Sequence, residues 1–372
     1  MEKAKISAIQ LFVLMVLFEV GTAQLVPLGK DAKQDAWIVV LLAMLGGCLL
    51  FFIYYALYKY YPEKQLTGFI EDILGNVLGK IVVFLYILYF MYLASIVLRD
   101  FGETLLTFAY AKTPLFCANA MMILIVVYAL RKGIEVVART GELLFIIAFV
   151  LAIIFIILVI VSGFVHMSFL RPVLESGGKE VLKTAFTKTI FFPFGEIVVF
   201  TMIFPYVSKP DKLMKATLSA IILSGTFLTL IMVMNLTVLG FDYVGRSQYP
   251  LLTVVQSIEL AGFIERLDVY FLVELMIGGF FKLGLFLYAA VTGVSTLFNF
   301  KEPSQLVYPL GIVVLMSSIL IASSYAEHSK EVIEWLPMYV HFPFQVLLPI
   351  ILLIIAYFKN RKKNRTSKPY GA

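Results

Sequence analysis

The chain has 372 residues, of which 61% are hydrophobic and 15% are charged, and its mean hydropathy is +0.95. Soluble domains are far more polar than this, so the composition predicts an integral membrane protein whose chemistry lies in the membrane or in short loops. The formal net charge of +6 does not indicate nucleic-acid binding, because the basic residues gather at the ends of apolar segments, as they do in membrane proteins.

Ten segments are candidates for membrane-spanning helices, each of which needs about 20 apolar residues. In chain order they are residues 8–28, 36–58, 81–109, 115–130, 142–163, 185–207, 216–240, 269–298, 305–323 and 341–358. The fourth is short, whereas the third and eighth are long enough to tilt or to extend beyond the bilayer. The loops on the N-terminal side carry roughly twice as many Lys and Arg residues as the opposite loops, which predicts that both termini are cytoplasmic.

Ten spans divide into two sets of five. An odd number per set makes the second set enter the membrane from the opposite side, as in an inverted repeat. We expect one transmembrane domain, with the first repeat in residues 1–163, an outer loop and the second repeat in residues 164–358, and a basic cytoplasmic tail in residues 359–372. Residues 63–76 predict a helix at the cytoplasmic surface, and residues 251–261 predict an amphipathic helix that caps a cavity from outside.

The first span of each set contains residues that interrupt a helix. In the first span the interruption covers residues 19–24 and includes Gly21 and Thr22, and in the sixth span it runs from Pro193 to Glu196. Proline removes a backbone donor, and glycine permits non-helical angles. Matching breaks in the two halves indicate a central binding site. The alternatives are a proline kink used for packing and small residues that only let helices approach each other.

Ionisable side chains inside the spans need a reason, because each costs on the order of 2.5 to 3.5 kcal/mol at the centre of a helix. Glu196 lies at the sixth-span break, where half-helix ends stabilise charge, so we expect it to bind ligand or to couple protons. Glu19 faces either the same cavity or a pairing partner in the cytoplasmic half. Lys282 either takes the place of a bound sodium ion between spans one and eight or pairs with a carboxylate.

The third span contributes charged and aromatic candidates. Arg99 and Glu103 are spaced to share one helix face, which predicts a structural ion pair near the outer end. Tyr89 and Tyr92 lie nearer the centre of the span and either line a pocket or pack in the core. The three histidines are scattered, and motifs such as H-E-x-x-H, the P-loop, G-x-S-x-G and G-x-G-x-x-G do not occur. We therefore expect neither an enzyme nor a bound metal or cofactor.

Several stretches together are similar to one known family. Residues 192–205 contain Phe-Pro-Phe-Gly-Glu and end in Met-Ile-Phe-Pro, and residues 265–288 contain Glu-Arg-Leu-Asp, then Lys282 and finally Leu-Phe-Leu-Tyr. Residues 1–7, 99–103, 131–135 and 246–252 fit the same pattern. Over nearly its whole length the chain resembles the spore permease family, the B subunits of Ger-type nutrient germinant receptors of endospore-forming bacteria. It looks most like a K-type B subunit.

The resemblance implies a fold and a binding pocket. The family is similar to the amino acid, polyamine and organocation transporters, which implies ten transmembrane helices in a LeuT-like 5+5 inverted repeat with helices 1 and 6 broken. By that analogy the pocket lies between spans one, three, six and eight. The residues that it places against the nutrient are Gly21, Thr22, Ala23, Phe194, Gly195 and Glu196.

The resemblance also implies a function and partners. The expected protein is a receptor in the spore inner membrane that is assembled with an A subunit and a C lipoprotein subunit, senses amino acids, sugars or nucleosides, and triggers ion release and germination. The first break lacks the Gly-x-Gly run of amino acid transporters, and in one of its two interpretations Lys282 takes the place of an ion, and both features argue against sodium-coupled uptake. The alternative is a proton-coupled symporter of amino acids or other small solutes, in which Glu19 or Glu196 carries the proton. An ion channel formed with the partner subunits overlaps the receptor hypothesis.

Overall fold

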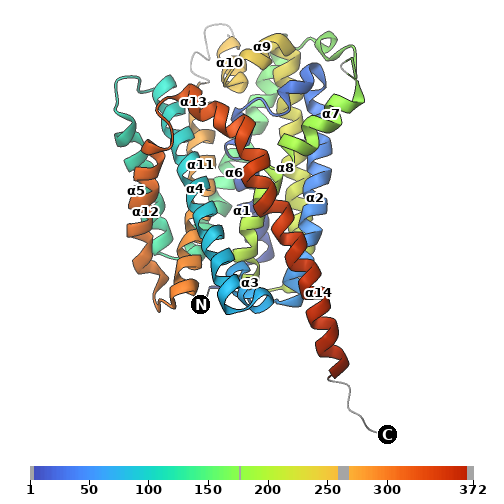
Figure 1. Cartoon of the computed structure of the whole chain (residues 1–372). Coiled ribbons are helices and arrows are strands. Elements are labelled where there is room, and N and C mark those ends of the chain that lie inside the picture. The colour runs from blue at the N-terminus through green and yellow to red at the C-terminus, as the bar shows by residue number, and fades with distance from the viewer. Residues whose placement is uncertain (1–3, 176, 259–267, 367–372) are drawn as a thin grey trace.

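The computed structural model describes residues 4–175, 177–258 and 268–366 of the chain. Every regular element within these ranges is a helix, and the isolated β-bridge found there joins Ile6 to Val207. The long helices pack side by side into a bundle, with short helices at its ends (Figure 1). The fold is therefore all-α, the class in which every backbone group of a spanning segment is satisfied within that segment.

The first half of the chain supplies five spanning segments. They are α1 (Ala8–Val20) with its continuation η1 (Ala23–Leu25), α2 (Ala36–Tyr60), α4 (Asn76–Phe108), α5 (Leu115–Arg131) and α6 (Ile134–Val161). Two shorter elements connect them, η2 (Lys30–Asp35) and α3 (Leu66–Leu74). The helix α3 confirms the short helix that is expected between the second and third spans.

The second half supplies five more segments, of which the first and the last are irregular. The first consists of α7 (Gly178–Thr184), the π-helical turn η4 (Ala185–Thr189) and the 3-10 helices η5 (Phe194–Met202) and η6 (Phe204–Tyr206). The middle three are α8 (Pro210–Leu239), α11 (Asp268–Phe298) and α12 (Val307–Leu320). The last consists of the π-helical η9 (Pro337–Leu347) and α14 (Leu348–Thr366), and α13 (Tyr325–Lys330) and the π-helical η8 (Glu331–Trp335) precede it.

Short helices connect these segments at the two ends of the bundle. They are η3 (Met167–Leu170), α9 (Phe241–Arg246), α10 (Pro250–Ser257) and η7 (Pro303–Leu306). The helix α10 forms most of the amphipathic helix that is expected in residues 251–261. Residues 259–261 of that expected helix lie outside the described residues.

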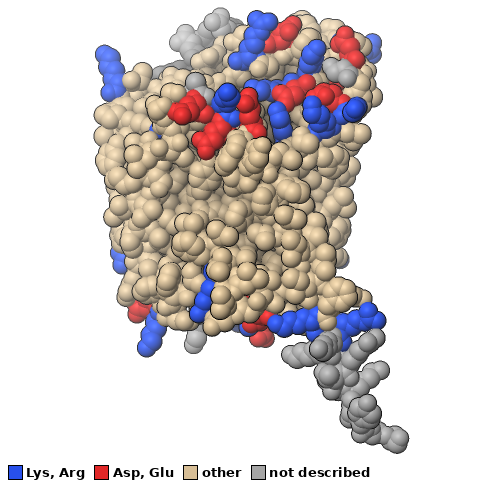
Figure 2. Space-filling model, viewed as in Figure 1, with Lys and Arg blue, Asp and Glu red and all other residues tan. Residues whose placement is uncertain are grey.

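Nine helical segments in the described ranges are long and apolar enough to cross a membrane, and α5 is a shorter apolar helix. Together they confirm the ten expected spans, including the short fourth one. On the face shown in Figure 2, charged side chains gather at the two ends of the molecule, with a broad band of uncharged residues between them. The chain is a multi-pass membrane protein, and α1 begins at the same end of the bundle at which α14 ends (Figure 1).

The spanning segments differ in how far the rest of the bundle encloses them. In the first, sixth and eighth segments 78% of the apolar window is buried, and in α4 67% is buried, whereas in α6 and the last segment only 22% is buried. The centre of the bundle is therefore built by α1, the segment that contains η5, α11 and α4. Buried polar groups are expected at this centre, because the peripheral helices face lipid.

Candidate functional site

The first helix breaks at Gly21, where it crosses α11. The Gly21 N–H still donates to the Leu17 carbonyl at 3.1 Å, but the next residues turn into η1. A Cβ added to Gly278 of α11 would lie 2.4 Å from Gly21 Cα, so the two backbones touch at this point. Only residues without a side chain permit such an approach. The expected break in the first span is thus confirmed, and it brings α1 against α11.

The sixth span breaks between η4 and η5. The π-helical turn η4 ends at Thr189, and after Pro193 the chain continues as the 3-10 helix η5. The Glu196 N–H donates to the Pro193 carbonyl at 3.1 Å, so Glu196 lies in the first turn of η5. The expected break is therefore confirmed, and the half that follows it is a 3-10 helix.

The two breaks lie beside a buried ion pair. Lys282 Nζ of α11 is 2.6 Å from Glu196 Oε2, and the side chains are 0% and 4% exposed. The ammonium group also lies 4.0 Å from the centre of the Phe192 ring and 5.4 Å from that of Phe18. The sequence left two interpretations of Lys282 open, and the structure shows it paired with a carboxylate. Cation–π contacts add to the stabilisation of the charge in this dry environment.

Glu19 lies close to this pair, at the end of α1. Its side chain is completely buried, and neither carboxyl oxygen has a hydrogen-bond partner within the described residues. Lys282 and Glu196 both act on it electrostatically, and the buried hydroxyl of Ser224 on α8 is a neighbour. Lys282 is therefore paired with Glu196 and acts electrostatically on a second buried carboxyl. A group of three such side chains can bind a small molecule that carries both charges, or it can hold and release a proton.

A hydrogen-bond network covers Gly195. The hydroxyl of Tyr89 on α4 lies 2.9 Å from His341 Nδ1, and Gln345 Nε2 donates to the same hydroxyl at 2.8 Å. Tyr54 of α2 donates to the Gln345 carbonyl at 2.6 Å. A Cβ added to Gly195 would lie 2.0 Å from Gln345 Oε1, so Gln345 occupies the space directly beside this glycine.

The other candidate residues lie in three different surroundings. Thr22 and Ala23 are buried just beyond the α1 break. Phe194 points to α2, because a Cβ added to Gly47 there would lie 2.7 Å from Phe194 Cβ. The hydroxyl of Tyr92 donates to Glu331 Oε1 at 2.7 Å, which ties α4 to η8.

The expected ion pair of the third span is present. Arg99 and Glu103 lie 2.7 Å apart, and Arg99 also donates to the carbonyl groups of Ser318 and Ile319 at the end of α12. This guanidinium is therefore used to hold α4 against α12, which confirms its structural role.

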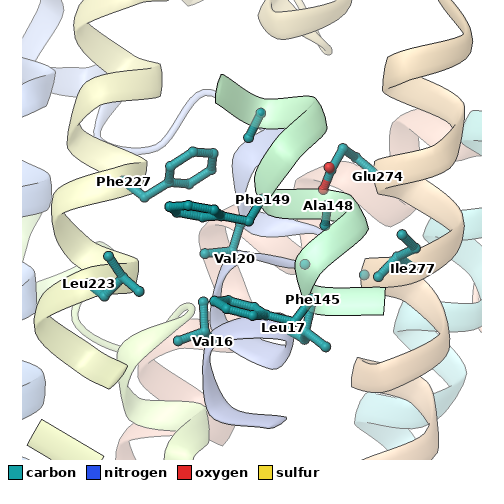
Figure 3. Close-up of a pocket in the computed structure, with 13 residues that line it drawn as sticks. Val16, Leu17, Val20, Phe145, Ala148, Phe149, Leu223, Phe227, Glu274 and Ile277 are labelled. Atoms are coloured by element: carbon teal, nitrogen blue, oxygen red, sulfur yellow. The ribbon is translucent and has the colours of Figure 1, made fainter. Parts of the chain in front are cut away.

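The sequence interpretation missed Glu274 of α11. This carboxyl accepts a hydrogen bond of 3.0 Å from Gln24, just beyond the α1 break, and lines a pocket between α1, α6, α8 and α11 (Figure 3). The signal was present in the sequence, because Glu274, like Lys282, is an ionisable residue inside the eighth span. Gln345 and His341 carried no comparable signal, because uncharged polar residues are common in membrane helices.

Comparison with known sequences identifies relatives over nearly the whole chain. The family model described as spore germination protein matches residues 5–326. Spore germination protein KB of Bacillus subtilis (strain 168) is 46% identical over 366 residues, which is 98% of each chain. Spore germination protein YndE of the same organism is 26% identical over 334 residues, which is 89% of this chain and 90% of the relative.

The fold has a close counterpart among solved structures. The crystal structure of MhsT in complex with L-phenylalanine, a protein with the LeuT fold, superposes with a TM-score of 0.68 at 15% sequence identity. The match covers 95% of this chain and 88% of MhsT. The LeuT-like architecture that is expected from the sequence is therefore confirmed.

Proposed function

Because the chain belongs to the spore germination protein family, we propose that it is the membrane subunit of a nutrient germinant receptor, which binds a small nutrient in a transporter-like pocket and thereby helps to trigger germination. The observation that carries this proposal is the buried group of Glu196, Lys282 and Glu19, where the first and sixth spans both leave helical geometry. Ionisable groups at broken membrane helices are costly, and polar solute binding is the role that typically accounts for them.

The charge group suits a nutrient with several polar groups. Lys282 offers an ammonium donor, while Glu196 and Glu19 offer carboxyl acceptors, so an amino acid can be recognised at both of its charged ends. A sugar or a nucleoside can use the same groups as hydrogen-bond partners. The backbone at Gly21–Ala23 and at Gly195, which departs from α-helical geometry, supplies further amide and carbonyl groups without interference from bulky side chains.

Nutrient binding beside Gly195 requires Gln345 to move. Its side-chain amide fills this space and donates to Tyr89, and Tyr54 donates to its backbone carbonyl. Gln345 lies on η9, in the last spanning segment, so its displacement links the nutrient site to that segment. A nutrient changes the conformation only to the extent that it binds one state better than the other. We propose that the displaced state of Gln345 is the state that the nutrient favours.

Signalling then passes to partner subunits. We propose that the chain resides in the spore inner membrane with both termini in the cytoplasm, assembled with an A subunit and a C lipoprotein subunit. The support for this arrangement is the family and the basic residues that follow the last span. The transporter fold would in this case serve as a sensor, and its conformational change would be coupled to a change in the partner subunits.

The proposal is tested in spores from which the gene has been deleted. Complementation with the native gene should restore germination in response to at least one amino acid, sugar or nucleoside. Complementation with Glu196→Gln should raise the half-maximal nutrient concentration at least tenfold at matched protein levels. Germination of the deletion strain that matches the wild type for every nutrient tested would contradict a receptor function.

A second candidate is a proton-coupled symporter for amino acids or other small solutes. The specific observation in its favour is Glu19, a buried carboxyl without a hydrogen-bond partner among the described residues, next to the Lys282–Glu196 pair. Such a carboxyl is suited to carry a proton between two states. Radiolabelled uptake distinguishes the two functions. Gene-dependent uptake that is abolished by Glu19→Gln, with unaffected germination, would establish the symporter and contradict the receptor.

A further inference from the structure

Besides Glu196 and Glu19, a further buried carboxyl, that of Glu274, lines a pocket beside the contact between α1 and α11. The pocket has a volume of about 50 Å³ and lies between α1, α6, α8 and α11 (Figure 3). Phe145 and Phe149 of α6 and Phe227 of α8 form much of its wall. Among the described residues that line it, Glu274 is the ionisable one.

Only one of the two carboxyl oxygens of Glu274 has a hydrogen-bond partner within the described residues. Its side chain is 6% exposed, and Oε2 accepts the hydrogen bond from Gln24, whereas Oε1 has no hydrogen-bond partner within the described part of the chain. Figure 3 shows the carboxyl group pointing from α11 toward α6, into the pocket. A buried carboxylate oxygen without a donor is destabilising, so this position favours a ligand that brings a donor.

We propose that this pocket binds a small organic ammonium ion, whose N–H groups donate to the free oxygen of Glu274 and whose alkyl part lies against the phenylalanine rings. An ammonium group supplies the missing donor and the opposite charge in one group. The faces of aromatic rings attract the same cation, and their apolar surface accommodates the carbon chain. The carboxyl and the rings thus recognise different parts of one ligand.

The chemistry of the walls excludes other ligand classes. A hard inorganic cation is held by several oxygen ligands, whereas the described side chains of this pocket are hydrocarbon apart from Glu274. An amino acid would bring a carboxylate for which these side chains offer no cation. The volume of about 50 Å³ is well below the ~150 Å³ of a cavity that holds benzene, so the organic part must be short.

This pocket adjoins the proposed nutrient site, because Gly21 and Gly278 also line it. Glu274 and Lys282 lie on opposite sides of Gly278 along α11, and Gly278 touches the backbone of Gly21. The contact between α1 and α11 therefore separates the two carboxyl sites. The proposal does not depend on the nutrient function, because it rests on Glu274 and the aromatic wall.

The test measures binding of propylammonium chloride to the purified full-length protein in lipid nanodiscs at constant ionic strength. The midpoint of thermal unfolding should rise with ligand concentration and reach saturation. Affinity should increase about fourfold per added methylene from methylammonium to propylammonium, and should stop increasing when the pocket is full. Glu274→Gln should weaken the apparent affinity at least tenfold, whereas Glu63→Gln, at an exposed glutamate, should leave it unchanged.

A second variant tests the pocket independently of whether Glu274→Gln folds. Phe149 is 45% exposed and lies on the wall of the pocket, so Phe149→Ala should weaken binding about threefold or more through loss of ring contact. Phe84→Ala is the matched control, because Phe84 is 47% exposed on α4 and does not line the pocket. Equal effects of the two phenylalanine variants would overturn the proposal.

Three other results would also overturn it. These are an unfolding midpoint that does not respond to propylammonium, an equal response to potassium or sodium chloride, and an affinity that Glu274→Gln does not change. Nanodiscs with and without phosphatidylethanolamine identify the source of the ammonium group. If the ammonium group of this lipid competes for the pocket and weakens the affinity for propylammonium, the natural ligand is a lipid amine. If the affinity for propylammonium is unchanged, the natural ligand is a free amine.

Discussion

Lys282 and Glu196 face each other in the centre of the bundle, with 2.6 Å between Nζ and Oε2. Both side chains are excluded from solvent, so each charge is tolerated only because the other is present. Breaking such a pair leaves one buried charge without compensation. The pair therefore couples α11 to the break in the sixth span.

Replacing one partner should destabilise the protein strongly. We expect Lys282→Met to lower the free energy of unfolding by about 3–5 kcal/mol, because it leaves Glu196 buried and unpaired. The double variant Glu196→Gln/Lys282→Met should recover at least half of this loss, since neither position of the pair then carries a buried charge. Reversible unfolding in mixed micelles measures both values.

An exposed pair provides the control for this prediction. Lys64 lies 2.6 Å from Asp72, with side chains that are 47% and 38% exposed. Lys64→Met should therefore cost only about 0–1 kcal/mol. A double variant at the buried site that loses the sum of its two single effects would show that the two residues do not depend on each other.

The crossing of α1 and α11 should not tolerate a methyl group. A Cβ on Gly278 would lie 2.4 Å from Gly21 Cα, which is backbone and cannot rotate away. We expect Gly278→Ala to lower the free energy of unfolding by about 1–3 kcal/mol, as overpacking does. Gly284→Ala on the same helix is the control, because its nearest neighbour is Val126 at 3.8 Å. Equal stability of the two variants would contradict the close crossing.

Removing Gln345 should sensitise the response to nutrient. Gln345→Ala empties the space beside Gly195, so the nutrient no longer has to displace a side chain. We expect the half-maximal nutrient concentration for germination to fall about three- to tenfold, which corresponds to roughly 1 kcal/mol. Gln65→Ala removes another buried glutamine, which donates to the Met202 carbonyl, and should cause no such fall. An unchanged or raised concentration for Gln345→Ala would refute the displacement step.

The attachment of α13 to α4 should weaken as the pH rises. His328 Nε2 lies 2.8 Å from Asp100 Oδ1. Burial lowers the pKa of His328, but the hydrogen bond and the charge of Asp100 outweigh it, so the pKa lies above its ordinary value. Arg99 lowers this pKa and Glu331 raises it, both to a smaller extent.

The sign of the pH dependence follows from the raised pKa of His328. Its stabilising effect is complete below the ordinary pKa of about 6.5 and is lost as the pH rises through the raised value in the folded state. The unfolding midpoint should therefore fall as the pH rises above about 6.5. His328→Gln should reduce this slope, and an identical slope in the variant would contradict the assignment.

The spans and their breaks could be predicted from the sequence because both are local properties. Apolar length marks the spans, and Pro193 and Gly21 mark the breaks. The partner of Lys282 could be predicted only as a carboxylate, because the identity of the partner depends on how α1 and η5 are rotated against α11. That rotation is set by packing between segments that lie far apart in the sequence.

Other features of the site could not be predicted for the same physical reason. The 3-10 geometry of η5 directs side chains differently from an α-helix, and it places the ring of Phe194, a candidate nutrient contact, beside Gly47. The contact of Gln345 with Gly195 joins the last span to the sixth, and no local pattern indicates it. Glu274 was detectable as an ionisable residue within a span, but the pocket around it depends on four helices.

The central claim is that the nutrient binds at the group formed by Glu196, Lys282 and Glu19. The most direct measurement is equilibrium binding of the radiolabelled nutrient to spore membranes that contain the intact receptor assembly, with membranes of the deletion strain as the blank. We predict saturable binding to native membranes and a half-saturation concentration at least tenfold higher for Glu196→Gln. Because half-saturation does not depend on the amount of protein, loss of some Glu196→Gln protein does not affect the comparison. Equal half-saturation in native and Glu196→Gln membranes would contradict the claim.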